Sequence, residues 1–294
     1  KIEGIALATD GRELDRRRIP APRGDYQESV RAIARLVGVL EDTTRERGSV
    51  GVGIPGAISP ATGLIKNANS TWLIGRPLAA DLARALDRPV RLANDANCFA
   101  LSEATDGAGA GAAVVFGVIV GTGTGGGLVV NGRVLAGANA IAGEWGHNPM
   151  PAAEDDERPG AACYCGRSGC IETWLSGPAL SRDYALGGGD QVSAVEIASR
   201  AAGGEGRATA VMARYEHRFA RAIASIINVL DPDVIVLGGG LSNIDRLYAN
   251  VPAIWSPFVF SDRVDTRLVR AVHGDASGVR GAAWLWEESG LRPA

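Results

Sequence analysis

The chain has 294 residues, of which 46% are hydrophobic and 21% charged, and its formal net charge at pH 7 is −3. These values are typical of a globular protein with one large or two ordinary domains, and they argue against collagen, disordered chains and basic nucleic-acid-binding proteins. The longest apolar runs, such as 112–120, are too short to span a bilayer, and no leader-like segment opens the chain. We therefore expect a cytoplasmic protein with reduced thiols and no membrane or nucleic-acid partner.

The first part of the chain predicts an α/β block. Residues 1–8 and 13–19 are strand-like and flank Asp10-Gly11, which is a hairpin signal. Apolar residues recur at helical spacing over 28–47. The elements that follow are a buried strand over 50–54, a helix over 78–86, a strand over 90–92 and a helix over 97–105.

A glycine-rich break at 107–111 precedes a second α/β block. Its predicted elements are strands over 112–120, 127–131 and 234–237, helices over 195–200 and 210–230, an irregular stretch over 136–159 and a last helix near 278–287. We expect a smaller domain over 1–107, joined by the closing helix over 278–290, and a larger domain over 108–277. Strand ends with glycine turns place ligand sites at the sheet edges and in the cleft between the domains.

Three of the four cysteines form the pattern C-x-C-x(4)-C at Cys163, Cys165 and Cys170. The glycines inside this pattern allow a tight loop, and His147 is the histidine nearest in sequence. A Cys3His set fits a structural Zn²⁺ with no coordination position open to water. The alternatives are plain buried thiols or a disulfide between the first two cysteines, which would be strained and disfavoured in the cytosol.

Two carboxylates flank this predicted metal loop. Glu144 lies three residues before His147, and Glu172 lies two residues after Cys170. Fixed by one metal, the two carboxylates would be placed to hydrogen-bond the hydroxyls of a polyol. The alternative for each is an ordinary surface carboxylate.

Two glycine clusters follow predicted strands. Gly121-Thr122-Gly123 opens a turn whose backbone N–H groups could cradle phosphate oxygens, although a plain hairpin needs glycine too. Gly238, Gly239 and Gly240 precede a helix expected to begin near Leu241, an arrangement that suits a nucleotide at a helix N-terminus. The pattern is not G-x-G-x-x-G, so a dinucleotide fold is not predicted.

Asp95 is the candidate general base. It lies at a predicted strand end, directly before a helix, and Asn94 and Asn97 flank it. A carboxylate there could accept a proton from a substrate hydroxyl. The alternative is that Asp95 is the N-cap of the following helix.

Together these motifs resemble the ROK family of sugar kinases and sugar-responsive repressors. The similar stretches are GEWGH at 143–147, CYCGRSGCIE at 163–172, GTGTGGG at 121–127, LANDAN at 92–97 and VLGGG at 236–240. The resemblance covers essentially the whole chain and implies an α/β, actin-like ATPase (ribonuclease H-like) fold of two domains with a cleft between them. Two further stretches, GIPGAISPATGLIKNANSTW and HGDASGVRGAAWLW, look most similar to bacterial fructokinases of the manno(fructo)kinase type.

The resemblance implies roles for individual residues. The base would be Asp95, and the hexose would be contacted by Asn94, Asp95, Glu144, His147 and Glu172. The ATP phosphates would lie against Gly121, Thr122 and Gly123, and the adenosine against Gly238, Gly239 and Gly240. Zinc would be bound by His147, Cys163, Cys165 and Cys170. Asn69 would add a sugar contact, with Asn67 as its rival, because the spacing to Trp72 is one residue shorter than is usual in the family.

The implied activity is ATP- and Mg²⁺-dependent phosphorylation of fructose, and also mannose, at the 6-hydroxyl, by a homodimer. The alternatives are a kinase for glucose or an N-acetylhexosamine, a sugar-responsive repressor with a helix-turn-helix upstream, and a zinc-stabilised sugar-binding module without catalysis. Such kinases carry a DxGGT phosphate turn on the first hairpin. We expect that turn to precede Lys1, since Lys1-Ile2-Glu3 is similar to the strand that follows it.

Overall fold

The structure is a computed structural model that describes residues 1–286, without the side chain of Asp275. The strands are β1 Ile2–Leu7, β2 Glu13–Ile19, β3 Val50–Ile54, β4 Ala57–Ile58, β5 Ile65–Lys66, β6 Val90–Asn94, β7 Val114–Val120, β8 Thr124–Val130, β9 Arg133–Val134, β10 Val234–Gly238 and β11 Arg267–Arg270. The α-helices are α1 Tyr26–Thr44, α2 Leu78–Leu86, α3 Asp95–Thr105, α4 Glu172–Leu175, α5 Gly177–Leu186, α6 Ala194–Ala202, α7 Gly206–Leu230, α8 Arg246–Trp255 and α9 Ser277–Trp284.

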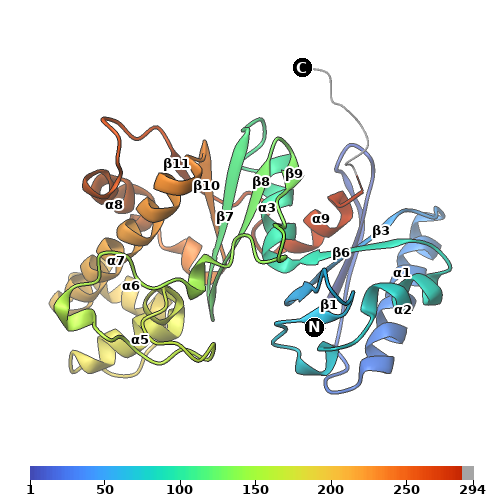
Figure 1. Cartoon of the computed structure of the whole chain (residues 1–294), viewed down its shortest axis with the longest axis horizontal. Coiled ribbons are helices and arrows are strands. Elements are labelled where there is room, and N and C mark those ends of the chain that lie inside the picture. Colours follow the sequence, from blue (N-terminus) through green and yellow to red (C-terminus); the bar gives the residue numbers. More distant parts are fainter. Residues whose placement is uncertain (287–294) are drawn as a thin grey trace.

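The N-terminal half contains the predicted hairpin and a parallel strand pair. β1 and β2 pair antiparallel through the turn at Asp10-Gly11, and β3 pairs with β6 in parallel. α1 and α2 close a small core around Tyr26, Leu78 and Leu82. In Figure 1 these elements form one side of the molecule.

A five-stranded sheet of order β11-β10-β7-β8-β9 organises the other half. β7, β8 and β9 pair antiparallel, whereas β7, β10 and β11 run parallel. Successive residues of β10 face opposite sides, as the period of two requires: Ile235 packs in the core with α7, and Val236 packs in the core with α3 and α9. The sheet is therefore covered on both faces, with α5–α8 on one side and α3 and α9 on the other (Figure 1).

Three details differ from the sequence prediction. β8 begins at Thr124, so Gly125–Gly127 lie inside the strand and not in a turn. The glycines at 238–240 lead into the 3-10 turn Gly240–Asn243, and the next α-helix begins only at Arg246, so the predicted helix from Leu241 is wrong. Several elements were not predicted from the sequence: the helices α4, α5 and α8 and the short strands β4, β5, β9 and β11.

The closing helix α9 returns to the N-terminal half and packs against α3, β3 and β1. The predicted helix over 278–290 extends past the described residues at 286. α3 also packs on β7 and β8, so it lies between the two halves. The division into residues 1–107 and 108–277 stays a proposal.

The crossing of α3 and α9 depends on Gly281. A Cβ at this position would lie 1.6 Å from the carbonyl oxygen of Cys98 on α3. Replacing Gly281 with alanine is therefore expected to push the helices apart and to lower the free energy of unfolding by about 1–3 kcal/mol. Gly278→Ala is the matched control on the same helix, because a Cβ there meets no heavy atom within 4 Å. Chemical denaturation of both variants checks this, and equal stabilities would contradict it.

Within the described part of the chain, none of the helices combines the length and apolar character needed to cross a bilayer.

Candidate active site

Strand β8 is the element on which the predicted site residues gather. A Cβ on Gly123 would lie 2.6 Å from Oε2 of Glu172, and one on Gly126 would lie 3.0 Å from the carbonyl oxygen of Gly143. A Cβ on Gly127 would lie 2.4 Å from the carbonyl oxygen of Ala96. The glycines of GTGTGGG therefore give room for α4, for the GEWGH loop and for the start of α3, and this packing brings together motifs far apart in the sequence.

Asp95 is the first residue of α3, and it is not the N-cap. Asn94 holds that place: its Oδ1 accepts from Ala96 N at 2.9 Å and Asn97 N at 3.4 Å, and its Nδ2 donates to the carbonyl oxygen of Gly56 at 3.0 Å. The Asn94 amide is thus occupied by structural contacts. Asp95 is left with one oxygen at 2.9 Å from Ala96 N and a side chain that is accessible to solvent.

The electrostatics of Asp95 suit a proton acceptor. The protein around its carboxylate removes part of the hydration, and this burial raises the pKa of Asp95 above its ordinary value. The negative charge of Glu144 raises that pKa further. A carboxylate with a raised pKa is a stronger base than an ordinary aspartate. The two carboxyl groups are therefore close enough to influence each other electrostatically.

Glu172 is tied to the predicted phosphate turn. It opens the one-turn helix α4, and its Oε2 accepts from Thr124 N at 2.9 Å. The GEWGH loop meets the same stretch of β8, because Nε1 of Trp145 donates to the carbonyl oxygen of Gly125 at 2.9 Å. Glu172 and the GEWGH loop are thus held to adjacent residues of one strand.

The predicted metal ligands converge. The ligand atoms of His147, Cys163, Cys165 and Cys170 all lie within 4.8 Å of one another. Nδ1 of His147 is 3.6 Å from Sγ of Cys163, and the Sγ atoms of Cys165 and Cys170 are also 3.6 Å apart. The edges of a tetrahedron around Zn²⁺ with Zn–S and Zn–N bonds of ordinary length are about 3.5–3.8 Å. The donor set and its spacing therefore fit Zn²⁺.

The thiols differ in their surroundings. The hydrogen bond from Arg167 lowers the pKa of Cys165 to about 6, whereas burial raises the pKa of Cys170 to about 12. Cys165 is exposed, while Cys163 and Cys170 are buried. The guanidinium of Arg167 thus favours the thiolate form that a metal ligand requires.

Tyr164 is a neighbour of the site that the sequence analysis missed. Its Oη lies 2.9 Å from Nε2 of His147, and the two rings meet edge to face at 5.1 Å. With Nδ1 of His147 turned toward the thiols, Nε2 is the nitrogen that faces away from them. The signal in the sequence was an aromatic residue between two candidate ligands.

The two glycine turns predicted for the nucleotide meet in space. A Cβ on Gly121 would lie 3.8 Å from Gly240 N, and one on Gly239 would lie 2.4 Å from the carbonyl oxygen of Val120. The N-terminus of α5 joins them, since Gly177 N donates to the carbonyl oxygen of Gly121 at 2.7 Å. Thr122 is exposed at the tip of the turn, between Gly121 and Gly123. These contacts bring the two turns and the start of α5 together at the ends of β7 and β10.

The two candidate asparagines of the N-terminal half, Asn67 and Asn69, are exposed. Asn69 is exposed, and its Oδ1 accepts weakly from Ser70 Oγ at 3.4 Å. Asn67 is also exposed and takes a left-handed φ of +55°. Neither has a contact that links it to Asp95 or Glu144, so the choice of Asn69 stays a prediction.

Comparison with known proteins agrees with this geometry. The family model described as ROK family matches residues 1–289. An N-acetyl-D-glucosamine kinase of Pectobacterium atrosepticum is 40% identical, over 97% of this chain and 95% of its own length, and one of Vibrio cholerae is 39% identical over 97% and 96%. The ROK hexokinase of Thermus thermophilus superposes with a TM-score of 0.83 at 29% identity, covering 96% of both chains.

A ROK family glucokinase of Streptomyces griseus, solved with glucose and AMPPNP, superposes with a TM-score of 0.75 at 25% identity and covers 95% of this chain and 93% of its own. These likenesses confirm the predicted actin-like α/β fold. The chain belongs to the ROK family and, within it, to the sugar kinases.

Proposed function

We propose that the chain is an ATP-dependent kinase that phosphorylates an N-acetylhexosamine, with N-acetyl-D-glucosamine as the first candidate acceptor and the 6-hydroxyl as the acceptor group. The observation that carries the proposal is Asp95. It is a solvent-accessible carboxylate that opens a helix packed on β8, the strand that follows the phosphate turn, and its pKa is raised by burial and by the charge of Glu144.

The choice of sugar departs from the fructose expected from short motifs. Relatives about 40% identical over nearly the whole chain are N-acetyl-D-glucosamine kinases, and this supports the alternative that the sequence analysis kept open. Whole-chain identity weighs more than two local stretches, because sugar preference depends on the shape of the complete pocket. Fructose remains the second candidate.

The proposed mechanism gives each residue a physical task. Asp95 accepts the proton of the sugar hydroxyl, and the hydroxyl oxygen attacks the γ-phosphorus of ATP in line. Glu144, Glu172 and Nε2 of His147 bind sugar hydroxyls, and a hydroxyl at Nε2 would take the place of the Tyr164 hydroxyl. Backbone N–H groups of Thr122 and Gly123 stabilise the phosphate charge. The N–H of Gly121 donates to the carbonyl oxygen of Gly123 at 2.9 Å and so holds the shape of the turn. Mg²⁺, when bound with ATP, neutralises charge on the phosphate oxygens.

Zinc is proposed as the structural ion of the His147, Cys163, Cys165 and Cys170 cluster. With four protein ligands it leaves no position for water, so it orders the loop and takes no part in the reaction. The ligand Cys170 lies two residues before Glu172, and this supports a role of the ion in fixing that carboxylate.

A panel of sugars tests the proposal. The full-length protein with ATP and Mg²⁺ is assayed for ADP release with N-acetyl-D-glucosamine, N-acetyl-D-mannosamine, glucose, fructose and mannose. We expect kcat/KM for N-acetyl-D-glucosamine to exceed that for fructose by roughly tenfold or more. A higher value with fructose or mannose would identify a fructokinase. ADP release with none of them, together with calorimetric binding of one, would favour the non-catalytic module.

A further inference from the structure

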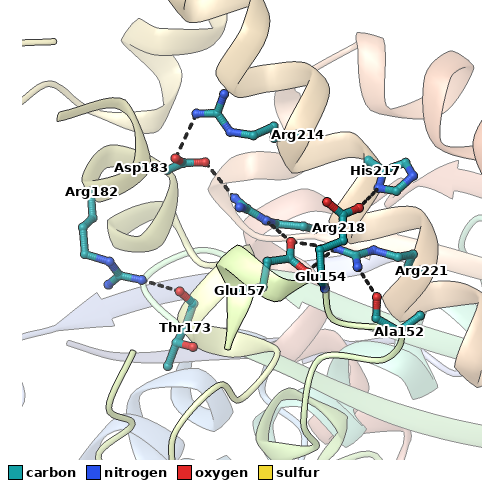
Figure 2. A network of polar contacts seen from close by, with 10 residues as sticks. All are labelled: Ala152, Glu154, Glu157, Thr173, Arg182, Asp183, Arg214, His217, Arg218 and Arg221. Atoms are coloured by element: carbon teal, nitrogen blue, oxygen red, sulfur yellow. Dashed lines mark hydrogen bonds and ion pairs between the residues drawn. The ribbon is translucent and has the colours of Figure 1, made fainter. Parts of the chain in front are cut away.

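An ion cluster with a buried centre lies on helix α7 and contacts both ends of the metal loop, residues 158–172, which carry Cys163, Cys165, Cys170 and Glu172. Its members, which we call the anchor cluster, are Glu157, Asp183, Arg214, Arg218 and Arg221 (Figure 2). The three arginines follow at helical spacing, so they lie along one face of α7. Glu157 comes from the irregular segment before the cysteines, and Asp183 comes from α5.

The centre of the anchor cluster is removed from solvent. Glu157 is 5% exposed and Arg221 is 3% exposed. Glu157 accepts from Nη2 of Arg221 at 2.7 and 2.8 Å and from Nε of Arg218 at 2.7 Å, and Arg218 also donates to Asp183 at 2.7 Å. Burial alone would raise the pKa of Glu157, but the hydrogen bonds from Arg221 and Arg218 lower it below its ordinary value. Glu157 is therefore ionised and fully paired.

A buried ion pair contributes little net stability, because desolvation offsets most of the attraction, but it strongly favours one arrangement of the groups it joins. In this protein the groups that the ion pairs join are helix α7 and the segments on either side of the metal loop. On one side Nη1 of Arg221 donates to the carbonyl oxygen of Ala152 at 2.5 Å, next to the segment that carries Glu157.

On the other side the cluster and its neighbours hold α4. The guanidinium of Arg218 lies over the ring of Trp174, 4.6 Å from its centroid. Arg182, one residue before Asp183, donates to the carbonyl oxygen of Thr173, and Tyr215 Oη donates to that of Leu175 at 2.8 Å. The segment between these two anchor points contains all three clustered cysteines and Glu172. Both ends of the metal loop are thus fastened to the same helix.

We propose that the anchor cluster positions the metal loop and Glu172 for sugar binding, with Glu157 and Arg218 as positioning residues. The inference rests on the proposed function for its kinetic consequence. Because Glu172 also accepts from Thr124 N, a shift of α4 would move its carboxylate relative to the phosphate turn. Misplacement of a binding group by about 1 Å is enough to weaken its interaction strongly.

The test compares two buried glutamates. Glu157 contacts arginines of α7, and Glu216 lies on α7 itself. Glu157→Gln removes the charge at the centre of the anchor cluster. Glu216→Gln is the matched control: Glu216 is 3% exposed, lies on α7 and accepts from Arg246 and Asn250 of α8, away from the metal loop. Glu157→Gln leaves the buried Arg221 without its counter-charge, so we expect Tm to fall by on the order of 10 °C. Glu216→Gln removes the charge partner of the half-buried Arg246, so we expect a fall in Tm of the same sign and smaller size.

Only Glu157→Gln should weaken binding of the sugar. In the full-length protein we expect Glu157→Gln to raise KM for N-acetyl-D-glucosamine about 10- to 100-fold, with KM for ATP changed by less than about twofold. Glu216→Gln should leave both values near those of the unmodified protein. Glu157→Asp and Arg218→Lys, which keep the charge, should show smaller effects in the same direction and serve if Glu157→Gln does not fold. Equal changes in KM for both glutamine variants, or no change in either, would overturn the proposal.

Hydrogen exchange separates this inference from the proposed function. Faster amide exchange over 158–175 in Glu157→Gln, but not in Glu216→Gln, is expected whether or not the sugar is the one proposed. If the unmodified protein turns over no hexose, the proposed function fails. The exchange of residues 158–175 then decides alone whether the anchor cluster positions the metal loop. Unchanged exchange in Glu157→Gln would refute the anchor.

Discussion

Replacing Asp95 with asparagine is expected to lower kcat by about 10²- to 10⁴-fold, because an amide cannot accept the proton of the sugar hydroxyl. Sugar binding should change only a few-fold, since asparagine keeps the size and hydrogen-bonding reach of the side chain and Asn94 still caps α3. The measurement is steady-state kinetics beside calorimetric titration with the sugar alone.

Stability distinguishes a catalytic Asp95 from a structural one. Its pKa is raised in the folded protein, so ionisation costs stability above that pKa, and the protonated form is favoured below it. The neutral side chain of Asp95→Asn should therefore keep Tm or raise it slightly at neutral pH. A structural aspartate would give the opposite sign, a lower Tm together with retained turnover, and that result would refute the assignment.

The same shift has a consequence for the pH profile. The base must be deprotonated to act, so kcat/KM should fall as the pH decreases through the raised pKa of Asp95, at a higher pH than for an ordinary aspartate. Asp95→Asn should lose this acid limb.

Local patterns predicted those elements whose signals are contained in a short stretch. The helix over 78–86 has the expected bounds, and the hairpin at Asp10-Gly11 has them to within one residue at each end of its first strand, because apolar spacing and turn chemistry act between near neighbours. α5 carries helix-start signals, since Ser176 caps it and Pro178 stands in its first turn, but a Gly-Pro pair is equally typical of a turn, so the local pattern does not predict the helix. β11 has only four residues and begins and ends with an arginine, which hides its strand character.

The candidate site was predictable as a set of residues but not as an arrangement. The glycines of GTGTGGG indicated that another part of the chain or a ligand comes close to this backbone. Only the fold shows that the neighbouring groups are α3, the GEWGH loop and Glu172. Likewise, nothing near Arg218 in the sequence indicates Glu157 as its partner, because the two lie on elements joined only by tertiary packing. The identity of long-range partners is what a single sequence lacks.

Loss of the proposed zinc is the second large effect. We expect one zinc per chain by elemental analysis, and Cys170→Ser should abolish it, because Cys170 is 1% exposed and its hydroxyl replacement cannot supply a thiolate to the ion. Removing a structural metal belongs to the small class of changes that cost more than about 4 kcal/mol, which corresponds to a fall in Tm of about 10 °C or more in a chain of this size. Turnover should fall with it, since Glu172 follows Cys170 by two residues and His147 is itself a ligand.

Cys98→Ala is the matched control for this change. Cys98 is also a free, fully buried thiol, but it lies on α3 in the core with α9 and outside the cluster. Its replacement should keep the zinc and lower stability only by the loss of packing, about 1 kcal/mol. If the unmodified protein were free of metal yet as stable and active as the zinc-loaded form, the four converging ligands would be ordinary core and surface residues. The placement of Glu172 and His147 would then depend on the contacts of α4 and the GEWGH loop alone.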